Sequence, residues 1–259
     1  MRITTRSFAA VLFTFLIAAV ALVQWPRHSA ALQTNTAISV VSAGNYLAPV
    51  TPEGIVALFG QGLSSQIFKA NTKPLPTSLG GVSIRVNGAF APLFFVSPGQ
   101  INFLIPAGTA TGLANIAVFA SDGSTRTGTV EIANAAPALF TFNADGNGVA
   151  AAVALRVTAN NTFVYEPIAQ YDATANRWQS LSLNLGPASE RLFLILYASG
   201  ARGVANSLRV LLGGIEVTPA AAGASPDFTG VEQINVEIPR ALIGRGRPNL
   251  SLIAANTRA

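Results

Sequence analysis

Short apolar runs separated by Gly, Pro, Asn and Ser make up most of the chain after its first 31 residues. Residues 55–59 form a continuous apolar run that ends at Gly60. Residues 82–86 alternate strictly between apolar and polar and close at Asn87-Gly88, a favoured hairpin dipeptide because both residues tolerate positive φ. Helical periodicity is nearly absent. The pattern therefore predicts an all-β fold built from short antiparallel strands.

Two further strand pairs are predicted downstream of this hairpin. Residues 93–96 and 101–105 are joined by residues 97–100, whose sequence Ser-Pro-Gly-Gln is typical of a type II turn. In that turn the proline fixes φ at the second position and the glycine supplies a positive φ at the third. Residues 115–120 and 127–132 flank a Ser-Asp-Gly-Ser turn and predict a final hairpin.

The same series of segments occurs twice along the chain. Residues 100–106 read QINFLIP, and residues 233–239 read QINVEIP. Three further pairs of segments match in the same order: 55–62 with 193–200, 82–88 with 208–214, and 115–118 with 249–252. Four matched segments in one order rarely arise by chance, so we interpret the chain as a tandem duplication of one β-domain.

This repeat sets the expected domain organisation. We expect an immunoglobulin-like β-sandwich over residues 32–135 and a second one over residues 136–259, with a hairpin insertion near residues 150–185. Each unit contains about seven short strands in roughly 100 residues, which fits two immunoglobulin-like sandwiches with Greek-key connections. The Cys–Trp–Cys pattern of antibody domains is missing, because the chain has no cysteine.

Two neighbouring phenylalanines interrupt the alternation in the first copy. Phe94 and Phe95 are adjacent, so they point to opposite faces of a strand and cannot both fill one core. Leu104 lies on the strand face opposite Ile101, at the position where the second copy has Glu237. We expect Phe94 or Leu104 to lie at a junction with the second domain, on an exposed apolar patch, or beneath a loop.

The first 31 residues have the layout of a secretory signal peptide. Arg2 and Arg6 precede an uncharged apolar run over residues 8–23, and Ser29 and Ala31 suit the two positions that a signal peptidase reads. We expect cleavage after Ala31 and export by the general secretory route to the periplasm, the cell surface or the medium. An uncleaved signal anchor is the alternative. No later segment is long and apolar enough to predict a membrane span.

The absence of key residue types excludes much of enzyme chemistry. The chain has no cysteine, and its one histidine, His28, is lost with the leader. Disulfides, thiolate nucleophiles, Ser-His-Asp triads and His-ligated metal sites are therefore excluded from the mature chain. A Gly-x-Ser-x-Gly elbow and a phosphate-cradling glycine loop are also absent from the sequence. We expect no cofactor, no metal and no catalytic residues.

The charge of the mature chain argues against nucleic acid as a partner. Loss of Arg2, Arg6 and Arg27 lowers the formal net charge from +5 to +2, because no acidic residue precedes position 32. A nucleic-acid footprint needs clustered basic residues on a strongly basic domain. The one basic cluster, Arg240 with Arg245 and Arg247, is interpreted as a solvated loop.

Three weaker patterns have ordinary structural interpretations. Residues 143–148 (Asn-Ala-Asp-Gly-Asn-Gly) carry part of a calcium-loop spacing but lack its other acidic ligands, which favours a turn. A Ser–Lys pair from Ser64 or Ser65 with Lys69 or Lys73 falls in a predicted polar loop. Four glutamates are the candidates for a carboxylate-based hydrolase, although nothing in the sequence brings two of them together: Glu53, Glu190, Glu232 and Glu237.

Many segments of the mature chain resemble one family. The family is the uncharacterised Solibacter-type C-terminal domain family of exported acidobacterial proteins, and the resemblance implies tandem Ig-like or IPT/TIG-like domains without an established activity. In that family the last strand is longer than the one predicted near Leu252, which is expected to lack a partner. The segments that carry the resemblance are residues 52–62, 75–82, 87–88, 91–103, 136–140, 184–200 and 230–239.

The sequence thus predicts an exported, non-enzymatic Ig-like module with a structural, adhesive or protein-binding role. The alternative is a carbohydrate-binding or accessory module for extracellular polysaccharide, in which exposed Trp178, Tyr165 and Tyr171 of the insertion form a stacking platform. The partner is accordingly an unidentified protein or glycan, and the oligomeric state is left open.

Overall fold

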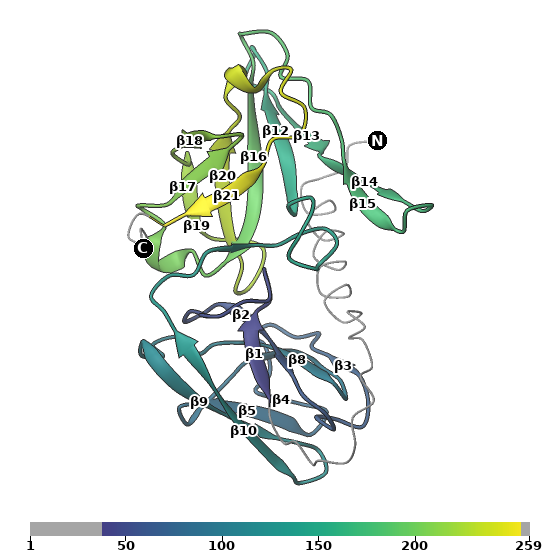
Figure 1. The fold of residues 1–259 in the computed structure, drawn as a ribbon, viewed down its shortest axis with the longest axis vertical. Helices are drawn as coiled ribbons and strands as arrows, with labels where there is room; N and C mark the ends of the chain where they lie inside the picture. The colour runs from purple at the N-terminus through teal and green to yellow at the C-terminus, as the bar shows by residue number, and fades with distance from the viewer. Residues whose placement is uncertain (1–37, 255–259) are drawn as a thin grey trace. The chain divides into compact units, whose positions relative to one another are not determined.

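The computed structural model describes residues 38–254, which form an all-β protein of antiparallel sheets (Figure 1). The predicted all-β fold class is confirmed. The predicted signal peptide lies outside the described residues. Within residues 38–254, no helix has the length and apolar character needed to cross a membrane.

The described residues divide into two compact units between Ala136 and Pro137, one residue beyond the expected joint. We call residues 38–136 the N-terminal unit and residues 137–254 the C-terminal unit. The strands of the N-terminal unit are β1 (Ser39–Ser42), β2 (Ile55–Phe59), β3 (Phe68–Lys69), β4 (Ser78–Leu79), β5 (Val82–Val86), β6 (Ala89–Phe90), β7 (Leu93–Val96), β8 (Gln100–Leu104), β9 (Gly112–Phe119) and β10 (Thr125–Ile132).

The C-terminal unit contains eleven strands and two single-turn 3₁₀ helices among its described residues. They are β11 (Ala138–Leu139), β12 (Ala152–Val157), β13 (Phe163–Pro167), β14 (Ala169–Asp172), β15 (Arg177–Ser180), β16 (Arg191–Ser199), η1 (Arg202–Val204), β17 (Arg209–Leu212), β18 (Ile215–Val217), β19 (Ala221–Ala224), β20 (Glu232–Glu237), η2 (Arg240–Leu242) and β21 (Leu250–Ile253).

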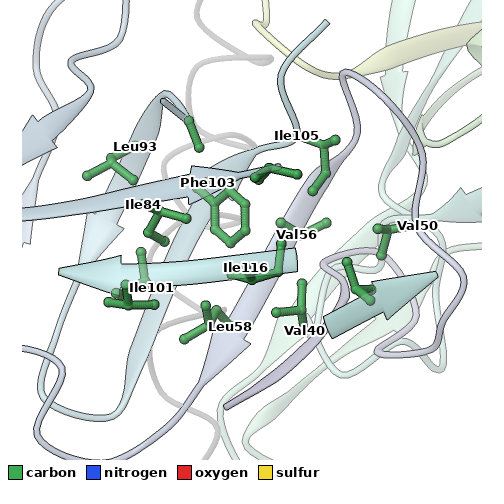
Figure 2. Close-up of a cluster of buried hydrophobic side chains, with 14 of the residues drawn as sticks. Val40, Val50, Val56, Leu58, Ile84, Leu93, Ile101, Phe103, Ile105 and Ile116 are labelled. Atoms are coloured by element: carbon green, nitrogen blue, oxygen red, sulfur yellow. The ribbon is translucent and has the colours of Figure 1, made fainter. Parts of the chain in front are cut away.

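The N-terminal unit is a sandwich of two sheets around one apolar core. One sheet has the order β1-β2-β8-β7-β3, and the other has the order β10-β9-β5-β4 with β6 paired to β5. Alternate residues of both sheets meet between them, including Leu58 and Phe103 from one sheet and Ile84 and Ile116 from the other (Figure 2). The sets β1-β2-β8-β7 and β10-β9-β5 follow the two sheets of a seven-stranded constant-type immunoglobulin sandwich.

A β-bulge in β7 allows both adjacent phenylalanines, Phe94 and Phe95, to be buried. Leu93 pairs with Phe103 and Phe95 pairs with Asn102, so Phe94 is an extra residue in the ladder. Because of the bulge, Leu93 and Val96 both reach the core between the sheets. Phe94 is only 6% exposed, so it does not form an exposed apolar patch.

The turn between β7 and β8 differs from the predicted type II turn. Gly99 does not have a positive φ, which a type II turn requires at its third position. The Ser97 hydroxyl instead accepts the backbone N–H of Gln100 at 3.0 Å, and the backbone N–H of Ser97 donates to the Gln100 carbonyl at 2.8 Å. The serine side chain thus replaces the carbonyl that would close a type II turn.

The described part of the C-terminal unit repeats much of this arrangement and adds further strands. Its larger sheet has the order β13-β12-β16-β20-β19, with β11 also paired to β16. Its second sheet has the order β18-β17-β21. Of the strands within the predicted insertion, β12 and β13 belong to the larger sheet, whereas β14 and β15 form a separate hairpin. In Figure 1 this hairpin extends away from the β16–β20 sheet.

The repeated QIN segments occupy the same place in the two units. Gln100 donates its side-chain amide to Asn102 at 2.8 Å, and Gln233 donates in the same way to Asn235 at 3.0 Å. Both pairs lie along one face of a central strand, β8 in the first unit and β20 in the second. Burial differs, because Gln100 and Asn102 are buried whereas Gln233 and Asn235 are partly exposed.

The strand registers also coincide. Ile84 pairs with Val118 between β5 and β9, and the matching residues Val210 and Leu252 pair between β17 and β21. The hairpins that follow are also equivalent, because a two-residue turn joins β5 to β6 and another joins β17 to β18. The segments matched in the sequence therefore hold equivalent positions and identical registers in the two units.

A buried tyrosine on β16 gives the C-terminal unit an alkaline pH dependence. Burial, reinforced by the charge of Asp227, raises the pKa of Tyr197 to about 12 from its ordinary value of 10.0. Its ring meets Phe228 edge-on at 5.8 Å. Because the unfolded chain ionises first, the stability falls as the pH rises from about 10 toward 12.

We expect this loss to be about 2 kcal/mol. Urea denaturation near neutral pH and again above about pH 11 measures it, with Tyr197→Phe as the matched variant. The variant removes the ionisable group and should lose correspondingly less stability. An identical alkaline loss in both proteins would contradict the assignment to Tyr197.

Candidate functional site

Side-chain hydrogen bonds close the tip of the predicted aromatic hairpin. Tyr171 on β14 pairs with Trp178 on β15. The Asp172 carboxylate accepts the backbone N–H groups of Thr174 at 2.9 Å and of Ala175 at 3.0 Å. The Tyr171 hydroxyl donates to the Asn176 side chain across the turn. These bonds fix the hairpin, so its side chains have defined positions.

Trp178 attaches the hairpin to the rest of the unit. Its ring stacks on Phe142 at 4.9 Å and meets Tyr171 at 5.8 Å, and it is partly buried between them. Its backbone N–H donates to the Asn143 side chain at 2.8 Å. The expectation that Trp178 is exposed is therefore wrong, because Phe142, 36 positions earlier in the chain, covers one face of the indole.

The other two predicted aromatic residues lie on separate sheets. Tyr171 is 51% exposed on the hairpin, whereas Tyr165 is 36% exposed on β13, the edge strand of the larger sheet. Phe163, two residues before Tyr165 on the same strand face, is 65% exposed. The hairpin thus offers the Tyr171 ring to solvent, and the predicted three-residue platform does not form as one surface of this hairpin.

Three of the four candidate glutamates each bind a different arginine, and the fourth lies in a turn. Glu190 receives a charged hydrogen bond from Arg156 at 3.0 Å. Glu237 pairs with Arg191 at 2.6 Å, and this hydrogen bond lowers the pKa of Glu237.

The two remaining glutamates differ in their surroundings. Glu232 is almost completely buried, and its carboxylate lies 3.5 Å from the Arg202 guanidinium and accepts the backbone N–H of Ala201. Glu53 occupies a turn with φ of 58°. Three of the four predicted carboxylates are thus each paired with a different arginine: Glu190 with Arg156, Glu237 with Arg191 and Glu232 with Arg202.

The other weak patterns are used structurally. Asp145 accepts the backbone N–H of Asn147 at 2.9 Å, which closes a turn within residues 143–148. The Ser64 hydroxyl accepts the N–H of Gln66 at 3.3 Å, while Lys69 is exposed on β3. Over residues 38–254 no cluster of three or more His, Cys, Asp and Glu side chains is arranged to hold a metal ion.

Within the predicted basic cluster, Arg240 binds a neighbouring turn of the backbone. The Arg240 guanidinium donates to the carbonyl oxygens of Leu185, Gly186 and Pro187, at 3.3, 2.6 and 3.1 Å. Arg240 is therefore exposed but also stabilises the turn at residues 185–187.

Sequence reasoning missed a cluster on the outer face of the N-terminal unit. Arg85 on β5 lies over the Phe90 ring at 4.3 Å and over the Phe119 ring at 5.7 Å. Phe90 is 49% exposed and Phe119 is 39% exposed, and Arg85 is itself exposed. Two cation–π contacts thus hold three exposed side chains in one arrangement. We call these residues the Arg85 cluster.

Exposed threonines of β10 lie beside the Arg85 cluster. On β10, Thr125 pairs with Phe119, and Thr127 and Thr129 continue along the same exposed face. In the C-terminal unit the positions of Arg85 and Phe90 are held by Leu211 and Glu216. The cluster therefore belongs to the N-terminal unit alone.

No protein-family model and no curated protein matches this chain.

Proposed function

We propose that the chain is an exported, non-catalytic module of two immunoglobulin-like sandwiches that binds another protein through the Arg85 cluster. The observation that carries this proposal is the pair of exposed phenylalanine rings fixed around one exposed guanidinium. Aromatic residues and arginine are the residue types most enriched in protein interfaces. Fixing the three side chains in advance lowers the entropy that binding costs.

Export and family membership belong to the same proposal. The basic, apolar and small-residue zones of residues 1–31 support secretion. The ordered motif matches over the mature chain support membership of the Solibacter-type domain family. The arginine-paired glutamates support a binding role over a hydrolytic one, because a glycosidase needs two carboxylates on either side of a bond.

A surface-binding assay tests the proposal. Fluorescently labelled residues 32–259 are added to cells of the encoding organism, and bound protein is measured against concentration. We expect saturable binding that protease treatment of the cells removes and periodate treatment leaves in place. Changing Phe90 and Phe119 together to serine should weaken binding at least tenfold.

The hairpin supplies the matched control. Tyr171→Ser removes an exposed ring from the C-terminal unit and should leave this binding unchanged. Sensitivity to periodate and to Tyr171→Ser, but not to the Phe90 and Phe119 changes, would instead support the carbohydrate-binding alternative. Absence of saturable binding would contradict the proposed function.

A further inference from the structure

The dipeptide Asn-Gly occurs twice in the chain, and its two copies have different surroundings. Asn87-Gly88 is the turn between β5 and β6, whereas Asn147-Gly148 ends the polar loop of residues 143–148. In such a dipeptide the backbone nitrogen of the glycine can attack the side-chain amide carbon of the asparagine. Glycine permits this attack because it has no Cβ to hinder the approach.

A neighbouring strand holds the first copy in place. The backbone N–H of Asn87 donates to the Asn115 carbonyl at 2.9 Å, and the Asn87 side-chain carbonyl accepts the Asn115 N–H at 2.8 Å. Asn87 and Gly88 have φ values of 49° and 88°, as a two-residue hairpin turn requires. Because these bonds fix the Asn87 side chain on β9, its reaction with Gly88 needs the end of β5 to separate from β9. Such opening of a strand ladder costs free energy and is infrequent.

The second copy is held only by short-range bonds of its own loop. Residues 142–149 lie outside any strand, and both Asn147 and Gly148 are exposed. Asn147 donates its backbone N–H to the Asp145 carboxylate at 2.9 Å and its side-chain amide to the Asp145 carbonyl at 3.1 Å. Turning the Asn147 side chain toward Gly148 therefore needs a local change in an exposed loop, which costs less than opening a ladder.

The same loop holds the β14–β15 hairpin. The Asn143 side-chain carbonyl accepts the Trp178 backbone N–H at 2.8 Å, and the Phe142 ring stacks on Trp178 at 4.9 Å. Gly148 lies close against Asn143, because a Cβ added to Gly148 would be 3.3 Å from Asn143 Nδ2. A change in the backbone between residues 147 and 148 therefore acts directly beside the contacts that hold Trp178.

We propose that Asn147-Gly148 is a modification site at which the chain deamidates without an enzyme, and that the product loosens the β14–β15 hairpin. The Gly148 nitrogen loses its proton to the solvent and forms a bond to Asn147 Cγ. The Cγ–Nδ2 bond breaks and ammonia leaves, which gives a five-membered succinimide ring. Water then opens the ring: breaking the bond from Cγ to the Gly148 nitrogen gives aspartate, and breaking the bond from the backbone carbonyl carbon gives isoaspartate.

The two products differ in their backbone. Aspartate adds one negative charge beside Asp145 and keeps the ordinary chain length. Isoaspartate adds the same charge and also inserts one methylene group into the backbone before Gly148. The longer backbone displaces Gly148 from Asn143 and so weakens the hydrogen bond that Asn143 accepts from Trp178. This site lies on a different unit from the Arg85 cluster and does not depend on the proposed function.

Ageing the protein measures the modification. Residues 32–259 are incubated near neutral pH and at a mildly alkaline pH, and proteolytic peptides are followed by mass spectrometry. Deamidation replaces an amide by a carboxyl group and changes the peptide mass, which isomerisation of Asp145 would not. We expect Asn147 to deamidate at least about tenfold faster than Asn87, and faster at the higher pH because the attacking nitrogen must lose its proton. In concentrated urea the two sites should react at similar rates, because the structure no longer separates them.

Amide hydrogen exchange by NMR tests the effect on the hairpin. In aged wild-type protein the isoaspartate form should exchange the Trp178 amide at least about tenfold faster than fresh protein does. Asn147→Ser removes the reacting amide, so the aged variant should exchange like fresh wild type. Fresh Asn147→Asp carries the charge on a backbone of ordinary length, and it should also exchange like fresh wild type.

Two results would overturn the proposal. One is an unmodified Asn147 after ageing, or equal rates at Asn87 and Asn147 in the folded protein. The other is unchanged exchange of the Trp178 amide in protein whose Asn147 has become isoaspartate, because the loop would then not transmit the change to the hairpin.

Discussion

Replacing Arg156 by methionine is expected to lower the free energy of unfolding of the C-terminal unit by about 2 kcal/mol. Arg156 bonds to Glu166 and Glu190 and donates to the Asn184 carbonyl at 2.6 Å. Its side chain is 13% exposed. Methionine keeps much of the apolar stem but leaves two neighbouring carboxylates without a counter-charge. The expected loss lies between those of exposed and fully buried pairs because the cluster reaches the surface.

Neutralising the two carboxylates provides the control. Combining Arg156→Met with Glu166→Gln and Glu190→Gln removes the like-charge repulsion and should recover a large part of the lost stability. Arg191→Met breaks the exposed pair with Glu237 and should have little effect. Urea denaturation of all variants measures these differences. No recovery in the triple variant would show that Arg156 acts through packing and not through charge.

The strands and their repetition could be predicted because they depend on local pattern. Alternation in residues 82–86 directs Ile84 into the core and Arg85 outward, and both residues lie as expected. The two QIN segments could be expected to occupy equivalent strands, because the matched segments follow one another in the same order in both copies. The type II turn predicted after β7 does not form, because the Ser97 hydroxyl competes with backbone carbonyls for the Gln100 N–H.

The candidate surfaces could not be predicted in the same way, because they join residues that are distant in the sequence. Arg85 meets Phe119 only once the register of β5 on β9 is fixed. Trp178 is partly buried because Phe142 lies against it, and nothing in the local sequence indicates this contact. The sequence carries one local indication of this cluster, namely an outward-pointing Arg85 next to the predicted hairpin turn at Asn87-Gly88.

The central claim is that the Arg85 cluster binds a partner protein, and the binding of labelled residues 32–259 to cells tests it most directly. Changing Phe90 and Phe119 together to serine should weaken saturable binding at least tenfold, because these two exposed rings flank the Arg85 guanidinium. Tyr171→Ser, which removes an exposed ring from the C-terminal unit, should leave binding unchanged. Equal binding of the wild type and the Phe90 and Phe119 double variant would contradict the claim.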